Sequence, residues 1–148
     1  SYYEDKWFPY TMPISDIVGL RAAVDNVLAD TEILARHARI AAATREAVTQ
    51  AGLHLYLQSG YSNTVTVIEV PEGLTDKAIL STMKDKYNVM ISGCFDVLSG
   101  KVIRIGHMGE NANEADLCMT LAAMDKTFAD LGYPLQCSMK EVFLACLA

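Results

Sequence analysis

The sequence lacks the features that mark several specialised classes of protein. It contains no uninterrupted apolar run near the ~20 residues that a membrane-spanning helix requires. Its net charge is −6, so it also lacks the net positive charge that is typical of proteins that bind nucleic acid. No CxxC pair occurs, and cysteines and histidines do not cluster, so we expect neither a disulfide framework nor a metal site. The nucleotide-binding patterns GxGxxG and GxxxxGK are absent, as are HExxH and GxSxG.

What is present is the composition of an ordinary globular domain. The chain has 148 residues, of which 51% are hydrophobic and 20% are charged. A chain of this length buries enough apolar surface to fold without a metal or a disulfide. The unpaired cysteines favour reduced thiols, and we predict a cytoplasmic location. The first residue is Ser1 rather than Met, so we expect a processed start or a piece of a longer chain.

Hydrophobic periodicity predicts alternating groups of helices and strands. Apolar residues recur at helical spacing in residues 14–29, 32–51, 76–87, 114–131 and 139–147. Alternating or β-branched segments predict strands at residues 53–58, 63–70, 89–93 and 101–108. This order predicts an α+β fold in which helices cover a small sheet of three to four mostly antiparallel strands.

Polar residues and glycines mark the ends of these predicted helices. Asn113 and Ser138 are natural N-caps, and Asp116 and Glu141 follow them at the spacing of a capping box. Gly52 ends the second helix, as a glycine just past a helix usually does.

The N-terminal part differs in composition from the rest. We expect an extended aromatic segment at residues 1–13, a connecting helix at 14–30 and a small α+β domain at 31–148. Prolines in the first segment keep their neighbours extended. So many exposed rings would be insoluble, so we expect them to lie on another surface. The rings in question are Tyr2, Tyr3, Trp7, Phe8 and Tyr10.

Arg104 is the polar residue that stands out from the pattern. In VIRIGHMG, strand alternation places Ile103 and Ile105 on one face and Arg104 on the other, just before Gly106. A guanidinium at a strand end can bind a carboxylate through two parallel hydrogen bonds, and a nearby glycine lets a ligand approach closely. The pattern alone nevertheless favours a solvated or salt-bridging arginine.

Two further residues carry reactive groups, but their positions in the sequence favour a functional role less than that of Arg104 does. His107 follows Arg104 closely in the sequence. It either supports or faces a ligand bound at Arg104, or it is an ordinary loop histidine, and the latter is the favoured interpretation. Cys94 follows a strand and a glycine, but no nearby histidine would activate it, so a buried thiol is the favoured interpretation.

Four collinear segments carry a resemblance to a known family. GKVIRIGHMGENANEADLCMTLAAMDKTFADLGY, FPYTMPISDIVGLRAAVDNVLAD, ARHARIAAATREAVTQAGLHL and SNTVTVIEVPEGL occur in the family's order and cover nearly the whole chain. They resemble the C-terminal small domain of class V, fold type I aminotransferases that depend on pyridoxal 5'-phosphate. The nearest branch is that of alanine–glyoxylate and serine–pyruvate aminotransferases, with pyridoxamine–pyruvate aminotransferase close by.

The resemblance implies roles for two residues of this chain. Arg104 matches the arginine that grips the substrate α-carboxylate. Thr11 matches the threonine of the T-x-P stretch, which reaches the cofactor phosphate of the neighbouring subunit. Phe8 stands where some relatives have a phosphate-binding tyrosine, and Tyr10 lies two residues further on.

The resemblance also implies what lies outside this chain. A large domain would carry the lysine that binds the cofactor, the aspartate at its pyridine nitrogen and the aromatic residue that stacks on its ring. The full-length enzyme would be a homodimer that moves an amino group between an alanine- or serine-type amino acid and a glyoxylate- or pyruvate-type oxo acid. We therefore expect no catalytic residue in this chain, and no activity of the chain alone.

Two other hypotheses compete with the hypothesis that this chain is part of an aminotransferase. One is a free-standing α+β regulatory module that binds an amino acid through Arg104. The other is a structural or dimerising piece without a ligand. The aromatic N-terminal segment favours the enzyme part, because a self-sufficient module has no reason to expose so many rings.

Overall fold

A computed structural model describes residues 2–5 and 10–148 of the chain. These residues fall into two compact units, with the boundary between Ile33 and Leu34, and each unit is described by itself. Trp7 and Phe8, two of the rings that the sequence predicts to lie on another surface, are outside the described residues.

The first unit contains two helices, α1 (Tyr2–Asp5) and α2 (Ile14–Ala29). The bounds of α2 agree with the periodicity. Residues 2–5 differ from the predicted extended segment, because proline restricts the residue directly before it and leaves positions further away to adopt a helical turn. No residue of α2 is buried, and its apolar side chains, such as Leu20 and Leu28, are exposed.

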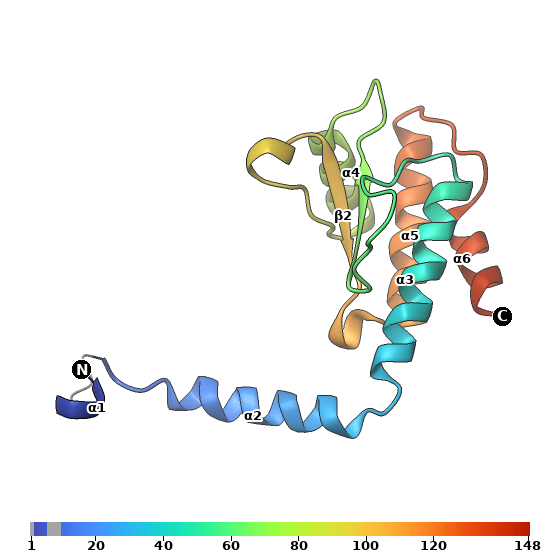
Figure 1. The fold of residues 1–148 in the computed structure, drawn as a ribbon. Coiled ribbons are helices and arrows are strands. Elements are labelled where there is room, and N and C mark those ends of the chain that lie inside the picture. Colours follow the sequence, from blue (N-terminus) through green and yellow to red (C-terminus); the bar gives the residue numbers. More distant parts are fainter. Residues whose placement is uncertain (1, 6–9) are drawn as a thin grey trace. The chain divides into compact units, whose positions relative to one another are not determined.

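The second unit is an α+β fold, as predicted (Figure 1). It contains helices α3, α4, α5 and α6 and strands β1 and β2, and α5 contacts both α4 and α6. The elements in chain order are α3 (Ile33–Gln50), β1 (Val65–Glu69), α4 (Asp76–Tyr87), η1 (Asp96–Leu98), β2 (Val102–Gly106), η2 (Gly109–Asn111), α5 (Glu114–Asp130) and α6 (Met139–Leu147).

The sheet has two strands among the described residues, so the prediction of three to four strands is wrong. β1 and β2 pair antiparallel, with Val65 opposite Gly106 and Glu69 opposite Val102. The two segments predicted as further strands each make one isolated bridge, Leu55 with Ile68 and Ser92 with Arg104.

The flanking segments begin at helix ends, which take their first backbone donors. Leu53 N–H donates to Val48 O at the end of α3 (3.2 Å), and Val89 N–H donates to Met83 O at the end of α4 (3.2 Å). An N–H used this way in a helix C-terminal motif is not available to a sheet ladder. Further along, Tyr56 N–H donates to Val67 O of β1 and Ser92 N–H donates to Arg104 O of β2.

The core lies between the helices and one face of the sheet. Ile68, Ile103 and Ile105 project from this face and are at most 2% exposed. Phe128 of α5 and Phe143 of α6 are fully buried in the same cluster. The opposite face carries Arg104, so strand alternation separates the core residues from the candidate ligand-binding residue.

The predicted helix caps are present. The Asn113 side chain accepts a hydrogen bond from Asp116 N–H at 2.9 Å, and Ser138 Oγ accepts one from Glu141 N–H at 3.3 Å. Gly52 follows α3 with φ +84°, a left-handed conformation that a glycine adopts without strain.

Candidate functional site

Arg104 occupies the middle of β2 and is held by backbone pairing on both sides. It lies opposite Val67 of β1. On its other side, its N–H donates to Ser92 O at 2.7 Å and its carbonyl accepts from Ser92 N–H at 3.1 Å. The position of its Cα is therefore set by two neighbouring segments rather than by a loop of its own.

The Arg104 side chain is half-buried and points its guanidinium toward the segment before η1. Its Nε donates to the Gly93 carbonyl at 2.7 Å. Within residues 2–5 and 10–148, Nη1 and Nη2 make no hydrogen bond or ion pair. A planar cation with two unused donor nitrogens is suited to a carboxylate, which accepts two parallel hydrogen bonds.

His107 lies at the end of β2 and is fully buried. Its Nδ1 donates to Asn63 O at 3.2 Å, and its Nε2 lies 2.8 Å from Thr66 Oγ1, which fits a hydroxyl donating to Nε2. Burial lowers the pKa of His107 below its usual value, against a smaller opposite effect of its backbone hydrogen bonds. A buried, neutral ring tied to β1 joins the two strands, so His107 does not face solvent.

His37 is a polar residue of the core that the sequence analysis did not single out. It is buried on α3, and its Nε2 accepts the Gly109 N–H at 3.0 Å. Gly109 has φ +60°, so the turn after β2 needs a glycine there. A histidine amid apolar residues at helical spacing was the available signal for such a role.

The remaining predicted site residues lie in several parts of the chain. Thr11 and Tyr10 belong to the first unit and are exposed there. Phe8 lies outside the described residues. Cys94 is a free, half-buried thiol. Among the residues that the structure describes, no group of histidine, cysteine, aspartate or glutamate is arranged to hold a metal ion.

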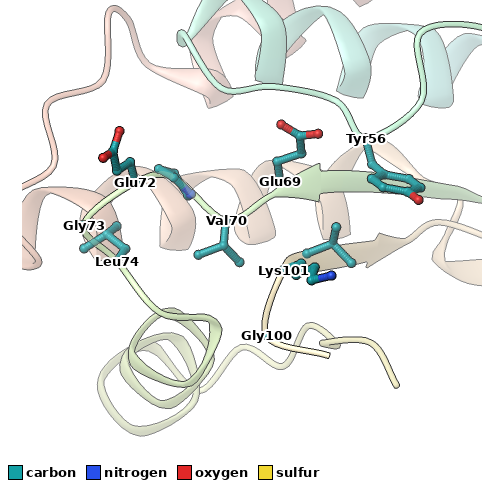
Figure 2. A pocket seen from close by; sticks show the side chains of 10 residues that line it. Tyr56, Glu69, Val70, Glu72, Gly73, Leu74, Gly100 and Lys101 are labelled. Atoms are coloured by element: carbon teal, nitrogen blue, oxygen red, sulfur yellow. The ribbon is translucent and has the colours of Figure 1, made fainter. Parts of the chain in front are cut away.

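An open pocket of about 420 Å³ lies at the end of the strand pair, where β1 leads into α4 and the chain enters β2. Figure 2 shows the carboxyl groups of Glu69 and Glu72 pointing away from Val70. Lys101 also lines the pocket, whereas Arg104 does not. The pocket is therefore separate from the guanidinium.

None of the described helices is long and apolar enough to cross a membrane.

Comparisons with known proteins give consistent results. The chain is 39% identical over 132 residues to a serine–glyoxylate aminotransferase of Arabidopsis thaliana, covering 86% of this chain and 33% of that protein. It is 36% identical to an L-aspartate–glyoxylate aminotransferase of Paracoccus denitrificans, covering 90% of this chain and 35% of that protein. No family model matches the chain.

The fold agrees with a solved structure of the same kind. The crystal structure of pyridoxamine–pyruvate aminotransferase from Mesorhizobium loti superposes with a TM-score of 0.88 at 34% identity. The match covers 97% of this chain and 38% of that protein. The chain spans about a third of the length of the curated relatives that it matches. By sequence and fold, the chain therefore matches a partial domain of the class V aminotransferases, their C-terminal region.

Proposed function

We propose that this chain is the part of a pyridoxal-phosphate-dependent aminotransferase that holds the substrate's α-carboxylate. Arg104 carries the proposal, because its Nη1 and Nη2 have no partner in the described chain while its backbone and its Nε are fixed. A guanidinium fork held in this way binds and orients a carboxylate at little entropic cost.

The substrates that we propose are small amino and oxo acids. The matched relatives act, by their names, on serine, aspartate, glyoxylate, pyridoxamine and pyruvate. For this chain we propose transfer of the amino group between an alanine- or serine-type amino acid and glyoxylate or pyruvate. Both partners of such a reaction carry the α-carboxylate that Arg104 would bind.

The residues of this chain fit a supporting role toward the cofactor. The described lysines, at positions 77, 84, 86, 101, 126 and 140, are all exposed, so none has the desolvated setting that activates a lysine amine. Thr11 is exposed, and its hydroxyl would donate to the cofactor phosphate of a neighbouring subunit. We therefore propose that the cofactor-binding lysine belongs to a large domain outside this chain.

In the intact enzyme, bound pyridoxal phosphate supplies the electron sink and carries the amino group. Arg104 binds the carboxylate, neutralises its charge and fixes the direction of the Cα–H bond. His107 does not touch substrate; it holds β1 and β2 together at the end of the strand that carries Arg104. A homodimer and a cytoplasmic location stay predictions.

The proposal is tested by replacing Arg104 in the full-length parent. Loss of two charge-assisted hydrogen bonds, worth about 3 kcal/mol together, lowers kcat/KM by roughly 10²-fold. We expect Arg104→Ala to raise KM for the amino acid and the oxo acid alike. Arg45→Ala is the matched control, because Arg45 is also half-buried but lies over the Tyr61 ring and donates to Ser62 O. An unchanged KM for both substrates would contradict the carboxylate role.

The isolated chain provides a second test. We expect it to be inactive and to leave pyridoxal phosphate unattached, which absorbance spectra of the mixed and dialysed chain would measure. Stoichiometric attachment to one lysine would place the cofactor site inside this chain and contradict the proposal.

A further inference from the structure

The guanidinium of Arg104 has two edges that can each take a carboxylate. One edge is formed by Nε and one Nη nitrogen, and the other by Nη1 and Nη2; each presents two parallel N–H donors. In this structure the first edge is already engaged, because Nε donates to Gly93 O at 2.7 Å. A carboxylate at that edge would have to displace the Gly93 carbonyl.

The Gly93 carbonyl is held in place from the N-terminal side of its segment. Ser92, the residue before it, makes two backbone hydrogen bonds with Arg104, of 2.7 and 3.1 Å. These bonds connect Gly93 to the backbone of the residue whose side chain it binds.

Contacts on the other sides also restrict this segment. A Cβ at Gly93 would lie 3.4 Å from Leu80 Cδ1 and 3.6 Å from Asp76 Oδ2, so the backbone passes close to α4. Further on, η1 is closed by Ser99 N–H donating to Asp96 O at 3.0 Å. The carbonyl and the guanidinium therefore belong to one tied unit.

We infer that Gly93 is a positioning residue. Its carbonyl accepts the N–H of Arg104 Nε, so that only the Nη1/Nη2 edge is left to bind the carboxylate. This inference rests on the proposed function, since it assumes that Arg104 binds the acid. It adds the direction of binding: the carboxylate lies end-on, in line with the Nε–Cζ bond and beyond the tip of the side chain. The segment before η1 thus takes part in substrate orientation through its backbone.

The first experiment measures hydrogen exchange of the Arg104 Nε–H in this chain. With 15N-labelled arginine, the Nε–H signal of Arg104 is assigned by its loss in Arg104→Lys, and hydrogen exchange with water is then followed. We expect the Nε–H of Arg104 to exchange at least tenfold more slowly than that of Arg39, which is exposed on α3. Equal exchange rates would overturn the inference, because an uncommitted Nε–H has no protection.

The second experiment uses the full-length parent crystallised with pyruvate or glyoxylate. We expect carboxylate oxygens within hydrogen-bond distance of Nη1 and Nη2, with the bond from Nε to Gly93 O retained. A carboxylate bound to Nε, with the Gly93 carbonyl displaced, would overturn this inference and leave the proposed function intact. A carboxylate bound away from Arg104 would overturn both.

Discussion

The carboxylate of Asp125 joins α5 to the start of α6, and its removal is the stability test best defined by the structure. Asp125 accepts hydrogen bonds from Ser138 Oγ at 2.7 Å, Met139 N–H at 2.9 Å and Lys140 N–H at 3.3 Å. The last two donors belong to the first turn of α6, where backbone N–H groups have no partner within the helix. Asp125 therefore caps a helix from another element.

The expected cost follows from these contacts. The two shorter bonds to a charged acceptor are worth about 1.5 kcal/mol each at the low end of the usual range. The negative charge at a helix N-terminus adds roughly 0.5 kcal/mol. Water replaces part of this, because Lys140 is exposed. We expect Asp125→Ala to lower the free energy of unfolding by about 2–3 kcal/mol, and Asp125→Asn by about half as much.

Urea unfolding followed by circular dichroism measures the effect, with thermal unfolding as a check. For a chain of this size, 1 kcal/mol corresponds to roughly 2–4 °C in Tm. A double-mutant cycle with Ser138→Ala isolates the shared hydrogen bond, and we expect a coupling of about 1 kcal/mol. A loss below about 0.5 kcal/mol for Asp125→Ala, a value typical of uninvolved surface positions, would refute the capping argument.

Three further predictions concern residues of the second unit. Because burial lowers the pKa of His107, its stabilising effect is complete above the unfolded-state pKa near 6.5 and is lost as the pH falls toward the folded-state value. His107→Gln should therefore flatten the fall in urea midpoint between pH 7 and pH 5, and an unchanged slope would contradict this assignment. Gly132→Ala should cost about 1 kcal/mol, because Gly132 has φ +71° and a Cβ there meets no atom within 4 Å; equal stability in thermal unfolding would argue against the left-handed turn. Phe128→Ala, which empties a fully buried site, should cost about 3–5 kcal/mol in urea unfolding, and a loss under about 1 kcal/mol would show that Phe128 is not in the core.

Short-range patterns were sufficient for helices α2, α4 and α6 of this protein, although they missed α1. The spacing of apolar residues predicted α2, α4 and α6 with the observed bounds. Asn113 and Ser138 were recognisable as caps because a cap depends on residues two or three positions away. The family resemblance was also readable from consecutive motifs, and the comparisons confirm it.

The sheet and the surroundings of Arg104 required the tertiary structure. Whether residues 53–58 and 89–93 extend into strands depends on partners that lie far away in the sequence. Leu53 N–H and Val89 N–H donate to helix ends, whereas Tyr56 N–H and Ser92 N–H donate to Val67 O and Arg104 O. The sequence singled out Arg104 as a candidate but gave no sign of the carbonyl that binds its Nε, which comes from Gly93, 11 positions earlier.

The two buried histidines illustrate the same division. The sequence determined that His107 follows a strand and that His37 lies in a helical stripe. The tertiary structure decided that His107 forms a hydrogen bond with Thr66, 41 positions away, and that His37 accepts one from Gly109, 72 positions away. Local propensity acts over one turn of helix or one pair of strand residues, whereas such contacts form only after the chain has folded and excluded water from both partners.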